Sequence, residues 1–184
     1  MVVIDPRRTE TAKIADRHLF IRPATDGLLL VALLKAVLTH PERPALPDYI
    51  DNLDAVAEAV SGFDSGACAA QCGVALPDIE WLADRMVTGP AALYGRIGAA
   101  TQSFGTLNAW LIGLINIASG QLDREGGLLF PTPLVDTVAM AGTGSVGRRH
   151  SRVSKHPLVM GEYPAAALAE EIETLGEGQI KALF

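Results

Sequence analysis

Residues 2–12 read Val2-Val3-Ile4-Asp5-Pro6-Arg7-Arg8-Thr9-Glu10-Thr11-Ala12, and residues 21–26 read Ile21-Arg22-Pro23-Ala24-Thr25-Asp26. Each stretch begins as a short apolar run, typical of a β-strand, and passes into a loop that holds a proline and a carboxylate. Ligands of open α/β proteins bind in the crevice beyond the carboxyl ends of parallel strands. The two loops therefore predict two walls of one nucleotide-type site.

The bulk composition agrees with one α/β domain. The chain has 184 residues, of which 49% are hydrophobic and 20% charged, and this length can bury a sizeable core. The net charge of −6 argues against a broad nucleic-acid surface. The longest apolar stretch, Gly27 to Leu38, contains Lys35 and is too short to cross a bilayer. No signal peptide is visible, so a cytoplasmic location without membrane insertion is favoured.

Apolar periodicity and turn residues predict the order of the elements. The predicted strands are 2–4, 18–22 and 91–94, with a further buried strand at 179–184. The predicted helices are 9–15, 26–40, 48–60, 66–72, 77–88, 105–119 and 164–173. Residues 121–155 form a glycine-rich and basic excursion without a clear period, which is usually functional, flexible or a surface for a partner.

Metal ligands are scarce in this sequence. Cys68 and Cys72, the two cysteines, would share one helix face, but no histidine or further cysteine lies nearby to complete four ligands. They are interpreted as small buried residues of a helix. An iron–sulfur cluster needs four such ligands, so no metal site is predicted within this chain. No catalytic residue is predicted either, because the four histidines share no spacing and none has an evident nucleophile partner.

Further motifs extend the opening pattern. They are Ala15-Asp16-Arg17-His18-Leu19-Phe20-Ile21, Tyr94-Gly95-Arg96-Ile97-Gly98, Ile117-Ala118-Ser119-Gly120-Gln121-Leu122-Asp123-Arg124-Glu125-Gly126-Gly127 and Gly161-Glu162-Tyr163-Pro164. Together with residues 4–12 and 22–26 they resemble the large catalytic subunit of the molybdopterin oxidoreductases, which include formate dehydrogenases, nitrate reductases and dimethyl sulfoxide reductases. The resemblance covers most of the chain, and Ala24 stands where the family usually has glycine.

The resemblance implies a Rossmann-like, three-layer α/β domain over residues 1–184, with a mostly parallel sheet flanked by helices. It also implies that this domain holds the guanosine end of one molybdopterin guanine dinucleotide. The residues carried over are Asp5, Pro6, Arg7, Arg8 and Thr9 on one wall, Pro23, Ala24, Thr25 and Asp26 on the other, and Gly98 as a third contact.

The residue types suit that ligand. A carboxylate such as Asp26 can accept hydrogen bonds from N1–H and the exocyclic amine of guanine, while Arg7 and Arg8 can donate to ribose or diphosphate oxygens. Asp5 could hold a ribose hydroxyl or orient the arginines. Each also has a structural interpretation: Asp5 and Pro6 could simply end a strand, Arg8 could be a solvated arginine, and Asp26 could cap its helix.

By the same resemblance, the chain is expected to be a piece of a larger oxidoreductase subunit and inactive in isolation. Molybdenum or tungsten, and any iron–sulfur cluster, would be held by parts of the enzyme outside it. The remainder of that subunit is the expected partner, an electron-transfer subunit is a further candidate, and self-association is a candidate behaviour of the isolated chain. Formate is disfavoured as substrate, because Leu128-Leu129-Phe130-Pro131-Thr132-Pro133 stands where formate dehydrogenases have V-R-G-Q-N-N.

Two alternatives belong to other function classes. A stand-alone nucleotide-binding or assembly module could reuse this fold without redox activity. A nicotinamide-dependent dehydrogenase would need G-x-G-x-x-G between the first strand and its helix, and the loop after Ile4 has no glycine. The match at Gly142-x-Gly144-x-x-Gly147 follows no convincing strand, so it is interpreted as chance.

Overall fold

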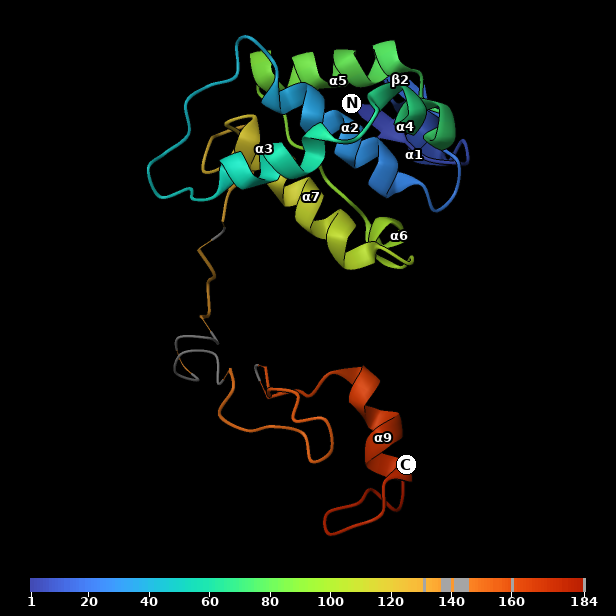
Figure 1. Ribbon diagram of the computed structural model, residues 1–184, viewed down its shortest axis with the longest axis vertical. Coiled ribbons are helices and arrows are strands. Elements are labelled where there is room, and N and C mark those ends of the chain that lie inside the picture. The colour runs from blue at the N-terminus through green and yellow to red at the C-terminus, as the bar shows by residue number, and fades with distance from the viewer. Residues whose placement is uncertain (131, 137–139, 141–145, 160, 184) are drawn as a thin grey trace. The chain divides into compact units, whose positions relative to one another are not determined.

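The computed structural model describes residues 1–130, 132–136, 140, 146–159 and 161–183 (Figure 1). The elements are β1 (Val2–Ile4), α1 (Glu10–Ile14), β2 (Arg17–Leu19), α2 (Asp26–Leu38), α3 (Leu53–Ser61), α4 (Ser65–Cys72), α5 (Leu76–Thr88), α6 (Ile97–Ala100), α7 (Gly105–Ala118), η2 (Ala165–Ala167) and α9 (Leu168–Glu173). The chain divides into two compact units, Met1–Phe130 and Pro131–Phe184. The expectation of one domain over the whole chain stays a prediction.

A parallel pair of strands begins the first unit. β1 pairs with β2 in the register Val2↔Arg17 to Ile4↔Leu19, and α1 connects them. Pro6, the second residue after β1, has no N–H to continue a ladder. Both strands therefore end at the same edge, and the loops after them start there. The predicted α/β class, a parallel sheet flanked by helices, is confirmed, although the sheet of the described residues has two strands.

Helix α2 is the centre of the first unit. It is apolar on all sides, with residues 29–34 and Val37 buried, which is typical of a helix surrounded by protein. It packs against α7, α4, α5 and α3, and Figure 1 shows it between α5 and α7. Cys68 and Cys72 of α4 are buried in this core as predicted, and burial raises the pKa of the Cys68 thiol.

The predicted third strand at 91–94 is wrong. This segment has no regular secondary structure and pairs with no strand in the part of the chain that the structure describes. Its backbone instead bonds to side chains: Asn116 Oδ1 accepts from the Leu93 N–H at 2.9 Å, and Asn116 Nδ2 donates to the Leu93 carbonyl at 2.9 Å. Gln121, also buried, donates to the carbonyls of Met86 and Gly89. The buried amide of Asn116 thus takes the place of a neighbouring strand at Leu93.

The other boundaries shift by a few residues. β2 ends at Leu19 rather than residue 22, and the Arg22 N–H donates to the Cys72 carbonyl instead of to β1. α3 starts at Leu53 rather than residue 48, directly after Asn52, which has left-handed backbone angles. No helix in the described part of the chain is both long and apolar enough to cross a membrane.

The second unit is held together by one acidic helix. The carboxylate of Glu171 in α9 accepts from the backbone N–H groups of Arg152 and Val153 and from Arg152 Nε. In residues 121–155 the described pairings are isolated bridges, Leu122↔Leu128 and His150↔Pro157. Gly142 and Gly144 of the G-x-G-x-x-G match lie outside the described residues.

The predicted buried strand at 179–184 is also wrong, with Phe184 lying outside the described residues. Gly176 and Gly178 both have positive φ, and they turn the chain back so that the Ile180 N–H donates to the Glu171 carbonyl. Leu183 beyond this turn is 70% exposed. The segment thus packs on α9 as a turn and has no strand neighbour among the described residues.

Candidate functional site

The first predicted loop is ordered by its own side chains. Asp5 Oδ1 accepts from the Arg7 N–H at 2.7 Å, and Thr9 Oγ1 caps α1 by accepting from the Ala12 N–H at 3.2 Å. The backbone carbonyl of Asp5 lies 3.0 Å from His18 Nε2 in β2. Asp5 and Thr9 thus fix both ends of the loop, and the residues between them are presented from a defined backbone.

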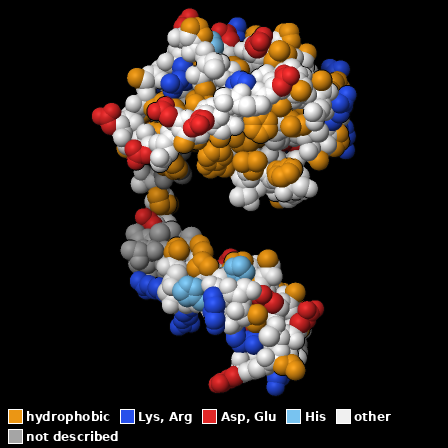
Figure 2. Space-filling view, viewed as in Figure 1, with side chains coloured by type: hydrophobic (Ala, Val, Ile, Leu, Met, Phe, Trp, Pro, Cys, Tyr) orange, Lys and Arg blue, Asp and Glu red, His pale blue; other side chains and the backbone are white. Residues whose placement is uncertain are grey.

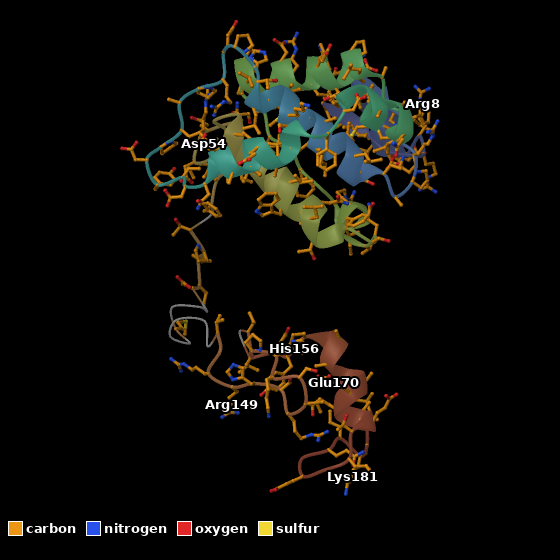
Figure 3. All side chains as sticks on the ribbon, in the orientation of Figure 1. Arg8, Asp54, Arg149, His156, Glu170 and Lys181 are labelled. Atoms are coloured by element: carbon orange, nitrogen blue, oxygen red, sulfur yellow. The ribbon has the colours of Figure 1, made fainter. Side chains whose placement is uncertain are left out.

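Arg7 and Arg8 are both exposed at this edge. Neither guanidinium donates a hydrogen bond or forms an ion pair within the part of the chain that the structure describes. Figure 3 shows Arg8 at the rim of the first unit, directed away from the helices. Two guanidinium groups are therefore available to oxygens of an anionic ligand.

The second predicted loop is anchored from both sides. Arg22 Nη1 donates to the carbonyls of Ala70 and Gln71 at 2.9 Å, which ties the loop to the end of α4. Thr25 Oγ1 donates to the Arg22 carbonyl at 2.6 Å. Between them Ala24 has φ of 63°, a left-handed conformation that glycine adopts more easily. This left-handed conformation explains why the molybdopterin oxidoreductases that the sequence resembles usually have glycine at this position.

Asp26 begins α2 and bonds to a residue that the sequence did not single out. Gln102 Nε2 donates to Asp26 Oδ2 at 2.9 Å and to the Gly98 carbonyl at 3.0 Å. Asp26 is half-buried, and its Oδ1 accepts no hydrogen bond within the described residues. Asp26 is not the cap of α2, since the capping position is Thr25. No spacing rule could reveal Gln102, because it lies 76 residues from Asp26.

A buried amide lies behind Asp26. Asn108 of α7 is fully buried and donates to the Ala99 carbonyl at 2.9 Å, while its Oδ1 has no partner among the described residues. A side chain at Gly27 would bring its Cβ to 3.0 Å from this oxygen. Glycine at position 27 therefore lets Asn108 pack against the first turn of α2.

The structure thus brings part of the predicted site together. Asp26 and Gly98 share the amide of Gln102, and the loop 5–9 starts beside β2. No hydrogen bond or ion pair joins Asp5–Thr9 to Asp26 in the described residues. Gly98 lies in α6 with open space where a Cβ would stand, so no packing inside this chain requires glycine there.

The surface near Gln102 is slightly hollowed. A shallow, open concavity of about 340 Å³ is lined by residues 100 and 102–107, Gln102 and Phe104 among them. Among the described residues, no group of three or more His, Cys, Asp and Glu side chains could hold a metal ion. The polar groups described for the predicted site are carboxylate, amide and guanidinium groups, which suit a polar ligand.

Known proteins share this sequence over long stretches. A nitrate reductase of Klebsiella oxytoca is 32% identical over 202 residues, which cover 100% of this chain and 23% of that protein. An assimilatory nitrate reductase of Haloferax mediterranei is 33% identical over 129 residues, which cover 66% of this chain and 17% of that protein. No protein-family model matches the sequence. The chain is therefore homologous to segments of nitrate reductases and spans less than a quarter of their length.

A solved structure shares the fold. Acetylene hydratase from Pelobacter acetylenicus superimposes with a TM-score of 0.60 at 20% sequence identity, over 65% of this chain and 17% of that one. The resemblance drawn from the sequence motifs is thus confirmed at the level of homology to segments of oxidoreductases.

Proposed function

We propose, from the homology of this chain to segments of nitrate reductases, that it is a domain of a molybdenum or tungsten oxidoreductase. Its task would be to hold the guanosine end of one molybdopterin guanine dinucleotide. The residues proposed to do so are Asp5, Pro6, Arg7, Arg8 and Thr9, then Pro23, Ala24, Thr25 and Asp26, with Gly98 nearby. When bound, that group would supply the redox chemistry, whereas the domain binds and orients it.

The observation that carries this proposal is the carboxylate of Asp26. One of its oxygens is tied to Gln102, and the other accepts no hydrogen bond from the described residues. Guanine presents two adjacent donors on one edge, which match the two oxygens of a carboxylate. Each oxygen has two lone pairs, so Oδ2 can keep Gln102 and still accept from a base.

The surrounding polar groups fit a nucleotide. The exposed guanidinium groups of Arg7 and Arg8 can donate to phosphate or ribose oxygens. Buried polar atoms normally have partners, yet Oδ1 of Asn108 lacks one among the described residues and lies beside Gly27 at the start of α2. Asn108 Oδ1 is fully buried behind Asp26, so the acceptor that a donor-bearing ligand can reach at this end of α2 is the half-buried Asp26 carboxylate.

The remainder of the catalytic subunit is the proposed partner. Phe104, at the N-cap of α7, and Leu107 and Trp110 within the helix recur at every third residue and are 66%, 43% and 52% exposed. Figure 2 shows hydrophobic side chains gathered over the face of the first unit that carries α6 and α7. Exposed apolar patches mark protein contacts. Relatives more than four times as long as their aligned part have the additional chain to cover this face.

The test is made on the native protein that carries this segment. We expect immunoprecipitation to yield a product several times longer than 184 residues, with molybdenum or tungsten by elemental analysis and guanine nucleotide after acid hydrolysis. Metal without guanine nucleotide would overturn the assignment of the guanosine end. A metal-free product of this length would leave the alternative, a nucleotide-binding or assembly module without redox activity.

A further inference from the structure

We infer that Gln102 is a positioning residue, which holds the Asp26 carboxylate toward the ligand and thereby sets selectivity for guanine over adenine. The inference rests on the proposed function. It starts from a long-range contact: Gln102 comes from the turn between α6 and α7, whereas Asp26 begins α2, and Nε2 lies 2.9 Å from Asp26 Oδ2.

The orientation of this amide follows from its partners. Nε2 faces a carboxylate oxygen of Asp26 and the carbonyl of Gly98, at 2.9 and 3.0 Å. An ionised carboxylate and a backbone carbonyl can accept hydrogen bonds but cannot donate them. The amide group of Gln102 that lies between them must therefore be the NH₂, because an oxygen there would face two other oxygens. Both amide hydrogens are therefore used, and the side chain has little freedom to rotate.

Gln102 is itself held in place by the turn that carries it. The Gly105 N–H donates to the Gln102 carbonyl at 2.9 Å. A Cβ at Gly105 would lie 1.8 Å from the Ala100 carbonyl oxygen, so only glycine permits this close approach. Asn108 Nδ2 adds a bond to the Ala99 carbonyl at 2.9 Å. The donor is thus fixed from two sides before any ligand arrives.

Without the hydrogen bond from Gln102, the Asp26 carboxylate could bond to the backbone N–H groups at the start of α2. Thr25 occupies the capping position of α2, but its hydroxyl donates to the Arg22 carbonyl and caps no N–H of the helix. An acidic side chain in the first turn is attracted to those unpaired N–H groups. Gln102 offers Asp26 a competing donor on the side of α6. It therefore keeps the carboxylate directed at the ligand rather than at its own helix.

Selectivity follows from a fixed carboxylate. The guanine edge has donors at N1 and at the exocyclic amine, whereas adenine has an acceptor at N1. A site that is built to pair with donors rejects the analogue that lacks them, because its own polar groups are left unpaired. A rotating carboxylate can turn away from adenine and loses this discrimination.

The experiment measures GDP and ADP binding by titration calorimetry on the full 184-residue chain. Gln102→Met keeps the length of the side chain but removes both donors. We expect its Kd for GDP to rise about tenfold, as for a lost hydrogen bond to a charged group, while its Kd for ADP stays the same or falls. Gln179→Ala is the matched control, because Gln179 Nε2 donates to the Ile172 carbonyl in the second unit; its GDP/ADP ratio should stay at the wild-type value.

A second variant tests the pH dependence of GDP binding, which a purely structural hydrogen bond between Gln102 and Asp26 would not affect. Gln102→Glu should weaken GDP binding at about pH 8, where two carboxylates face each other, and recover it at about pH 5, where the new carboxyl increasingly carries a proton to donate. Equal GDP/ADP ratios in the wild type and in Gln102→Met would overturn the inference and leave the proposed function standing. A wild type that does not prefer GDP would overturn both.

Discussion

The side-chain amide of Asn116 exchanges two hydrogen bonds with the backbone of Leu93, each 2.9 Å long. Asn116 is 1% exposed in α7, and Leu93 lies in the segment that the sequence predicts as a third strand. The amide presents an N–H and an oxygen side by side to Leu93, as a peptide group does. One buried asparagine therefore satisfies a backbone that a neighbouring strand would otherwise have to satisfy.

Removing this amide should destabilise the first unit. Asn116→Ala leaves the Leu93 N–H and carbonyl without partners, and we expect the free energy of unfolding to fall by about 2–3 kcal/mol. Denaturant titration followed by circular dichroism measures it. Gln71→Ala, on the exposed face of α4, should change stability by less than about 0.5 kcal/mol. Equal midpoints for both variants would show that Asn116 does not hold this segment.

The sequence predicted what depends on local pattern. The strand at 2–4 and the helices predicted at 9–15 and 26–40 follow from apolar runs and turn residues, and the structure has all three within a few residues. The strand at 91–94 was wrong because its apolar character reflects packing on the core, whereas strand pairing depends on a distant neighbour. The role of Gln102 was not predicted for the same reason, because a polar contact between residues 76 positions apart produces no periodic pattern in the sequence.

The backbone at Ala24 predicts a stabilising substitution. Ala24 has φ of 63°, where alanine is strained by about 1 kcal/mol and glycine is not. Ala24→Gly should therefore raise stability by at most about 1 kcal/mol, because the added freedom of the unfolded chain offsets part of the gain. Ala55→Gly inside α3 is the control with the opposite sign, with a loss of about 1 kcal/mol. Thermal unfolding compares the two, and a loss in both would contradict the strain at Ala24.

The second unit should lose stability in acid. Burial alone would raise the pKa of Glu171, but the N–H groups of Val153 and Arg152 and the charge of Arg152 outweigh it and lower that pKa. A carboxyl with a depressed pKa contributes stability above its unfolded value and loses it as the pH falls through its folded value. The wild type should therefore weaken below about pH 4.5, the ordinary value for this group.

Glu171→Gln tests this linkage. The amide cannot ionise, so the variant should be less stable than the wild type at pH 7 and should show a shallower loss of stability as the pH falls below about 4.5. The amide signals of residues 152 and 153, which bond to Glu171, report on it by nuclear magnetic resonance. Parallel pH profiles for the two proteins would mean that another group causes the acid loss.

The apolar side of α7 predicts self-association of the isolated chain. Leu107 and Trp110 are exposed there, and burying such surface between copies is favourable by about 25 cal/mol per Å². Leu107→Glu with Trp110→Glu should shift the chain toward monomer in sedimentation velocity. Leu175→Glu, at an 84% exposed site in the second unit, should leave the distribution unchanged. An equal shift with Leu175→Glu would point to charge alone.

Asp26→Asn should exchange the base that the site prefers. The amide of asparagine has one donor and one acceptor where the carboxylate has two acceptors. Xanthine differs from guanine in having a carbonyl in place of the exocyclic amine, so it presents one donor and one acceptor on the same edge. We therefore expect the Kd for GDP to rise at least about tenfold and the Kd for xanthosine diphosphate to fall. Asp51→Asn, at an exposed position before α3, should keep the wild-type preference. A general loss of both ligands would indicate a damaged loop, and unchanged preference would remove Asp26 from the base-binding position.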